Sequence, residues 1–247
     1  MTDRPYILWP PDWTAMFEID GGGTKATRAA KAYFRQADRA DVCCVGMAHR
    51  QDVREWLAPI YAATGMPRCE VLTQFGYDGT QATYDKMLAT DRVYLIANRP
   101  EIVVCDVEQH LSDPPSAKLD EDIRKLTSLQ IDELWFFEAE HWGGRTYGDG
   151  PSPHAYPAPV VAGENQDYQI RCGKSLFNRD GKQMRATNGI VWMRPSTGEW
   201  LPRVDEFVDA VRIVRAFRPR RIGIWPGPAD ADDPTWTLLK AGADVWQ

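Results

Sequence analysis

Carboxylates at the ends of two predicted strands are the strongest chemical signal in this sequence. The segment IVVCDVE ends in Asp106 and Glu108, and the segment ELWFFEAE ends in Glu138 and Glu140. Alternate residues of a strand share a face, so the two carboxylates of each segment lie on one face. Two nearby carboxyl groups can act as general acid and general base, and their mutual repulsion raises at least one pKa. We therefore expect these four residues to be catalytic.

The apolar residues of each strand are expected to face the surrounding helices, which would turn the carboxylates inward. On the second strand this apolar set is Trp135, Phe137 and Ala139. Further polar and aromatic side chains also follow predicted strands, and Arg194 among them can balance the carboxylate charge. The predicted substrate-binding residues are Asp12, Gln74, Trp142, Glu164, Trp192, Arg194 and Trp225.

Strands and helices must alternate to bring these residues together. Apolar runs predict strands at 6–9, 41–47, 69–75, 101–108, 133–140, 159–164, 189–194 and 220–227. Amphipathic stretches predict helices at 25–39, 52–63, 80–98, 203–217 and 233–242, and a further helix that starts after the prolines of the segment 112–130. Continuously apolar strands separated by helices are typical of a parallel sheet that is covered on both faces.

The length of 247 residues fits a single-domain α/β protein with a (β/α)8, TIM-like barrel. An open, doubly wound sheet is the alternative. No shift in composition marks a domain boundary. Residues 143–188 are rich in Gly, Pro and Asn, which predicts a loop or hairpin insertion on the face that carries the site. In a barrel, that face is formed by the carboxyl ends of the strands.

Charge and hydropathy exclude several classes of partner. The net charge of −6 argues against a nucleic-acid partner, because nucleic-acid binding needs a basic surface. No apolar run approaches the roughly 20 residues of a membrane span. The start MTDRPYILWPPDW lacks the basic region and apolar core of a signal peptide. We therefore expect a cytoplasmic protein, or one released without a cleaved signal; nothing in the sequence indicates an oligomeric state.

The five cysteines indicate neither a disulfide framework nor a zinc site. Their number is odd, two are adjacent, and no CxxC occurs. Cys43, Cys44 and Cys105 are expected to be small core residues. The histidines near the carboxylates could join them in a metal site, but no HxH or HExxH spacing is present. No metal and no cofactor are expected, and metal-dependent hydrolysis or isomerisation remains an alternative.

The segment IVVCDVEQ resembles the fourth-strand Asp-x-Glu of glycoside hydrolase barrels, such as the chitinase-like family 18 and the lysozyme-like family 25. This resemblance implies that Glu108 is the general acid and that Asp106 assists the reacting centre. Ile102 and Val104 stand where the longer chitinase pattern has acidic residues, and the EAE of the fifth strand is not part of that pattern.

A second segment, IDGGGTK, resembles the first phosphate loop of the sugar kinases in the actin-like ATPase superfamily. In that family the Asp helps to hold magnesium. Here the glycines run into a predicted helix, which favours a simple loop with Thr24 as the helix cap and space for an anion at the helix start.

The sequence as a whole favours a glycoside hydrolase that acts on a carbohydrate substrate by carboxylate catalysis. Trp142, Trp192 and Trp225 would line the sugar subsites. The alternatives are a non-catalytic carbohydrate-binding or assembly protein on the same scaffold, a metal-dependent enzyme and a sugar kinase.

Overall fold

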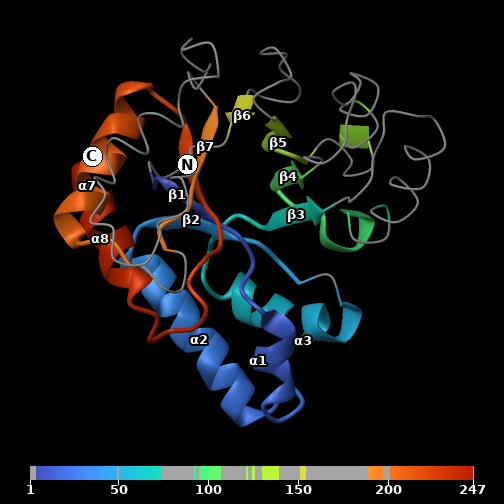
Figure 1. Ribbon diagram of the computed structural model, residues 1–247. Helices are drawn as coiled ribbons and strands as arrows, with labels where there is room; N and C mark the ends of the chain where they lie inside the picture. Colours follow the sequence, from blue (N-terminus) through green and yellow to red (C-terminus); the bar gives the residue numbers. More distant parts are fainter. Residues whose placement is uncertain are drawn as a thin grey trace.

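In the computed structural model of this chain, parallel strands alternate with helices in the two terminal parts, residues 6–73 and 190–246 (Figure 1). The structure describes residues 4–48, 50–73, 92, 95–106, 121, 124–125, 130–138, 151–153, 189–196 and 201–246. Its strands form two sheets of four strands each.

The first sheet has the strand order β2-β1-β8-β7, and all its pairs are parallel. Strand β1 lies between strands from opposite ends of the chain, because Ile7 pairs with Cys44 on one side and with Gly223 on the other. The bounds of these strands are β1 Tyr6–Leu8, β2 Val42–Val45, β7 Ile190–Met193 and β8 Arg221–Ile224.

The second sheet has the order β3-β4-β5-β6 and is also entirely parallel. One row of its register joins Cys69, Ile102 and Glu133, and the next joins Val71, Val104 and Trp135. The bounds of its strands are β3 Cys69–Thr73, β4 Ile102–Asp106, β5 Glu133–Glu138 and β6 Pro151–Pro153.

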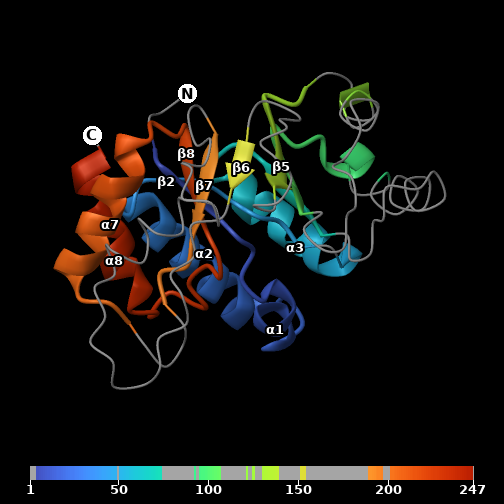
Figure 2. The same ribbon diagram turned by 45° about the horizontal axis from the view of Figure 1, so that its top comes forward.

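The two sheets approach each other at both of their ends. Gly46, just after β2, forms a parallel bridge with Cys69 of β3, and the N–H of Met47 donates to the carbonyl of Cys69 at 3.0 Å. Strand β6 lies beside β7 (Figure 2). The strands therefore follow one another in chain order from β1 to β8, and β8 pairs with β1. A closed barrel needs this order, and the barrel itself stays a prediction.

Two groups of buried side chains divide the interior. The outer core lies between the first sheet and its helices, and it includes Leu8, Tyr33, Leu57 and Val211. The inner cluster draws residues from both sheets: Ile7, Cys43, Cys44, Cys69, Val71, Ile102, Val104, Trp135, Ile190 and Trp192. The two sheets thus share one apolar interior, and the helices cover the first sheet from outside (Figure 1).

Helical spacing of apolar residues explains most of the helices. In α2 (Thr24–Arg39), the buried residues are Ala26, Ala30, Tyr33, Phe34 and Ala37, all on one face. The other described helices are α1 Trp13–Glu18, α3 Gln51–Ala62, α7 Val204–Ala216 and α8 Thr235–Trp246. The sequence analysis did not predict α1, because a helix of six residues is too short to show a recognisable periodicity of apolar residues.

The predicted strands at 6–9, 41–47, 189–194 and 220–227 are confirmed with shorter bounds, and those at 69–75, 101–108 and 133–140 are confirmed in their described parts. The predicted sixth strand at 159–164 lies outside the described residues. Within 143–188, only 151–153 is described, and it forms β6 instead of a loop. No described helix is long and apolar enough to cross a membrane.

Candidate functional site

Three tryptophans gather at the carboxyl ends of β1, β7 and β8, and we call them the strand-end aromatic group: Trp9, Trp192 and Trp225. The ring of Trp9 meets that of Trp192 edge to face, with centroids 5.9 Å apart. It meets the ring of Trp225 in the same way at 6.4 Å. Trp192 is fully buried, whereas Trp9 and Trp225 are half-buried and pack on the inner cluster. The group therefore has a buried base and two rings that reach the surface.

Backbone hydrogen bonds extend the sheet as far as these two outer rings. The N–H of Trp9 donates to the carbonyl of Ile224 at 3.0 Å, and the N–H of Trp225 donates to that of Met193 at 3.0 Å. Both tryptophans are thereby held in register just beyond their strands. Side chains mounted on rigid strand ends are well placed to bind a ligand, since their positions are set before it arrives.

Arg194 belongs to the same region. Its guanidinium lies over the ring of Trp225, 5.2 Å from the centroid, which is within the range of a cation–π contact. Two of the predicted substrate-binding residues, Arg194 and Trp225, are therefore neighbours. Trp192 lies in the same region, but it is buried beneath Trp9, so its role is to pack against the other rings.

Trp9 is a site residue that the sequence analysis missed. It stands two positions after Ile7, a member of the inner cluster, so strand alternation gives it the same face. The signal was present in the run YILW, which ends in this tryptophan.

Asp106 ends β4, where it pairs in register with Thr73 of β3. Alternation gives position 106 the parity of Ile102 and Val104, both members of the inner cluster. The inward orientation of the Asp106 carboxylate stays a prediction. Its partner in the predicted pair, Glu108, lies outside the described residues.

The expected orientation of β5 is wrong. Trp135 was expected to face the helices, but it belongs to the inner cluster with Ile102 and Trp192. Because alternate residues of a strand share a face, position 138 belongs to the face of Leu134 and not to the face of Trp135. The apolar residues of this strand thus do not mark its helix side, because the interior between the two sheets is itself apolar. The backbone gives no support for an inward Glu138.

Glu133 holds a buried charge at the opposite end of β5. It is fully buried, and its Oε1 accepts from Nη2 of Arg221 in β8 at 2.9 Å. Arg220 lies 3.0 Å from the same oxygen, and the indole N–H of Trp135 donates to Oε2 at 3.1 Å. This carboxylate is saturated by cations and donors at the amino end of the strand, so its role is structural.

Asp12 also has a structural role, although it was predicted to bind substrate. Its carboxylate accepts from the backbone N–H of Ala15 at 2.8 Å and so caps α1. The other predicted site residues cannot be placed, because they lie outside the described residues: Gln74, Glu108, Glu140, Trp142 and Glu164.

The predicted core positions of Cys43, Cys44 and Cys105 are confirmed, since all three are buried as free thiols. Cys69 is a further buried free thiol. Burial raises the pKa of the Cys44 thiol well above its usual range, which keeps it protonated and unreactive. Among the described residues, no group of three or more His, Cys, Asp or Glu side chains could hold a metal ion.

The glycine-rich loop before α2 is closed by its own aspartate. The carboxylate of Asp20 accepts from the backbone N–H groups of Lys25 at 2.8 Å and Ala26 at 3.0 Å. These hydrogen bonds lower the pKa of Asp20. Gly23 holds the cap position, so the prediction of Thr24 as the cap is wrong. Asp20 occupies the donors that an external anion would need at this helix start.

The sequence matches no protein-family model and no curated protein.

Proposed function

We propose that this protein is a glycoside hydrolase with a (β/α)8 barrel, in which Glu108 is the general acid and Asp106 stabilises the reacting centre. Three features support the barrel: strands that are all parallel, pairing in chain order, and an apolar interior shared by both sheets. In such a barrel the carboxyl ends of β1, β4, β7 and β8 lie at one rim.

The strand-end aromatic group is the observation that carries this proposal. The half-buried rings of Trp9 and Trp225 stand at right angles, with an interplanar angle of 90°. Indole rings offer large apolar faces against which the C–H faces of sugar rings can pack. Arg194, beside Trp225, adds donors that suit sugar hydroxyl groups.

The carboxylates of the proposal are Asp106, which ends β4, and Glu108, which lies two positions further along the sequence and outside the described residues. Position 106 has the strand parity of Ile102 and Val104 in the inner cluster. One acid would protonate the leaving oxygen, while the other would stabilise the positive charge that develops on the sugar. Glu138 and Glu140 have the same strand parity, which is that of Leu134, so neither is used in this scheme.

A non-catalytic carbohydrate-binding protein is the second candidate, because the aromatic group alone would suffice for binding. The two functions differ in turnover. A binding protein would retain polysaccharide without releasing reducing ends, and substitution of Asp106 or Glu108 would leave the affinity unchanged.

Affinity electrophoresis in gels that contain different polysaccharides tests the binding surface. Retardation in at least one gel should be lost in Trp225→Ala, which removes one of the outer rings. Trp246→Ala is the matched control, since Trp246 packs on the outer core at the end of α8. Equal retardation of wild type and Trp225→Ala would refute the role of the aromatic group.

A further inference from the structure

A row of cations runs along α2, separate from the strand-end aromatic group. Lys25, Arg28, Lys31, Arg35 and Arg39 follow one another at intervals of three or four residues, which places them on one side of the helix. The protein as a whole has 35 acidic against 29 basic residues, so this row opposes the overall charge.

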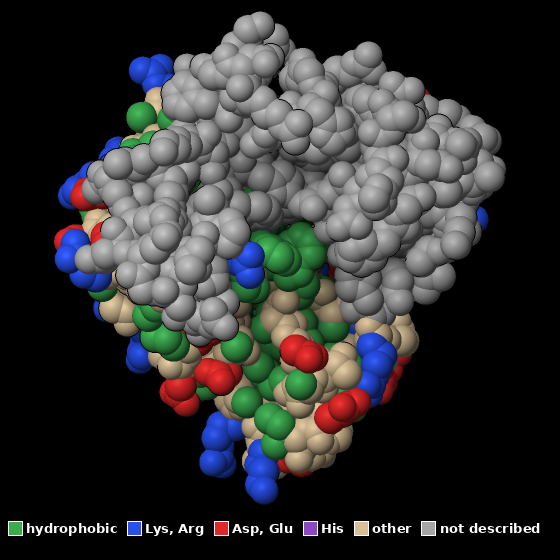
Figure 3. Space-filling view, in the orientation of Figure 1, with side chains coloured by type: hydrophobic (Ala, Val, Ile, Leu, Met, Phe, Trp, Pro, Cys, Tyr) green, Lys and Arg blue, Asp and Glu red, His purple; other side chains and the backbone are tan. Residues whose placement is uncertain are grey.

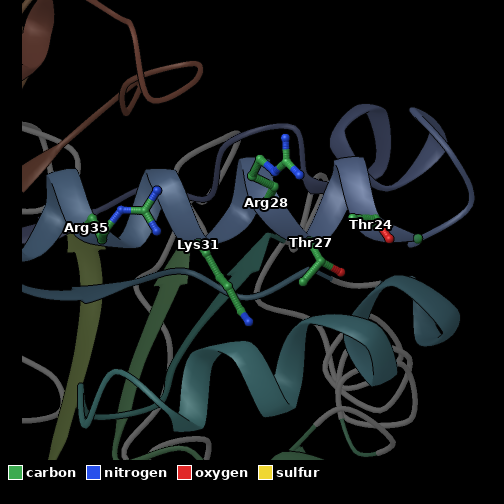
Figure 4. A pocket seen from close by; sticks show the side chains of 6 residues that line it. Thr24, Thr27, Arg28, Lys31 and Arg35 are labelled. Atoms are coloured by element: carbon green, nitrogen blue, oxygen red, sulfur yellow. The ribbon is translucent and has the colours of Figure 1, made fainter.

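Three of these cations surround a hollow of about 510 Å³ on the surface of α2. Arg28, Lys31 and Arg35 line it together with Gly23, Thr24 and Thr27. In Figure 4 the side chain of Arg35 extends along the helix toward Arg28, and Lys31 projects on the side of α3. Lys and Arg side chains also project from the lower edge of the molecule in Figure 3, where α2 begins in Figure 1.

Several other exposed arginines of this protein are paired with carboxylates. Arg50 binds Glu18 and Asp52, and Arg212 binds Asp209. Asp38 is the one acidic residue of α2, and it forms an ion pair with Arg4, with 2.8 Å between Oδ1 of Asp38 and Nη2 of Arg4. Within the described ranges, no Asp or Glu forms an ion pair with the three cations of the hollow.

Like charges three and four residues apart on a helix repel each other. Helix stability therefore gives no reason for this arrangement, whereas an external anion would relieve the repulsion. Such an anion would be held by side chains and not by the helix terminus, because Asp20 already accepts from Lys25 and Ala26. The hydroxyl of Thr27 is also engaged, since it accepts from Trp56 and lies 3.4 Å from the carbonyl of Gly22.

We propose that Arg28, Lys31 and Arg35 form a binding site for a small soluble polyanion that carries phosphate or sulfate groups. Guanidinium groups bind tetrahedral oxyanions through paired hydrogen bonds. Arg28 and Arg35 are two turns apart, about 10 Å along the helix, so a ligand with several charged groups spans them better than a single ion. The three cations lie within about two turns of one helix, which suits a compact ligand, and the net charge of −6 disfavours a long nucleic acid.

Calorimetric titration of the full chain with sodium tripolyphosphate, at an ionic strength of about 0.15 M, tests this site. The triple variant Arg28→Gln, Lys31→Gln, Arg35→Gln should weaken binding by about tenfold or more. The matched control is Arg99→Gln, Arg218→Gln, Lys240→Gln, which removes three exposed cations elsewhere and should stay within about twofold of wild type.

Two further arms identify the ligand. Arg35→Lys retains the charge but loses the paired hydrogen bonds, so it should weaken tripolyphosphate binding less than the triple variant does. Titration with oligomers of dextran sulfate distinguishes a sulfated from a phosphorylated ligand, and binding of either supports the proposal.

Three results would overturn the site. The first is a wild-type protein that binds neither soluble probe. The second is equal weakening in the triple variant and its control, which would mean a general charge effect. The third is binding to phosphatidylserine vesicles without binding to a soluble probe, which would mean a membrane surface.

Discussion

Trp192 lies directly against Gly223 of the neighbouring strand, with no space for a methyl group between them. A Cβ atom at Gly223 would stand 2.2 Å from Cδ2 of Trp192. The two residues are register partners in β7 and β8. Glycine at position 223 is thus what allows the indole to lie across β8 and support Trp9.

Gly223→Ala should therefore destabilise the protein by about 1–3 kcal/mol, as overpacking of a core does. Urea unfolding measures this change. In the double variant Gly223→Ala, Trp192→Leu the smaller side chain removes the clash, so the double variant should be more stable than the sum of the two single changes predicts. Strict additivity would mean that the two residues do not compete for space.

The buried carboxylate of Glu133 should matter more than any surface ion pair. Glu133→Gln leaves Arg221 buried without its counter-charge, and breaking such a pair costs about 3–5 kcal/mol. Asp205→Asn, at the exposed pair with Arg203, should cost less than about 1 kcal/mol. The free energies of unfolding of both variants, each compared with wild type, test this prediction. Similar losses of stability in the two variants would contradict the structural role of Glu133.

Asp20 should make the stability of the start of α2 depend on pH. Hydrogen bonds from Lys25 and Ala26 lower its pKa in the folded state, so its contribution is complete above the unfolded pKa of about 3.9 and is lost as the pH falls through the folded value. Asp20→Ala should be less stable than wild type at neutral pH.

In acid, this difference between Asp20→Ala and wild type should disappear. Asp132→Asn, an exposed aspartate without a helix to cap, is the control. Thermal unfolding at a series of pH values measures the difference, and a gap that stays constant down to about pH 2 would contradict the role of the carboxylate.

Periodicity predicted most described elements of the fold. The apolar runs of β1, β2, β7 and β8 are buried throughout, and buried parallel strands are recognisable as continuous apolar runs. The same property hid the orientation of β5. When both faces of a strand are apolar, as with Leu134 and Trp135, composition does not tell the inner face from the outer one.

The candidate site was predictable only in part. Trp225 and Arg194 follow strands, and their position at a strand end was enough to select them. Asp12 follows a strand too, but its carboxylate caps α1, and a short helix after two prolines leaves little sequence signal. The ion pair of Glu133 and Arg221 joins residues 88 positions apart, which no local pattern can reveal.

The release of reducing ends from polysaccharides tests the central claim most directly. Wild-type protein should hydrolyse at least one member of a panel of α- and β-linked polysaccharides, and Glu108→Gln should be slower by about 10²–10⁴-fold, the usual contribution of a general acid. Asp132→Asn, which removes an exposed carboxylate just before β5, should keep the wild-type rate. A Glu108→Gln rate equal to that of wild type, or no hydrolysis of any member of the panel, would contradict the account.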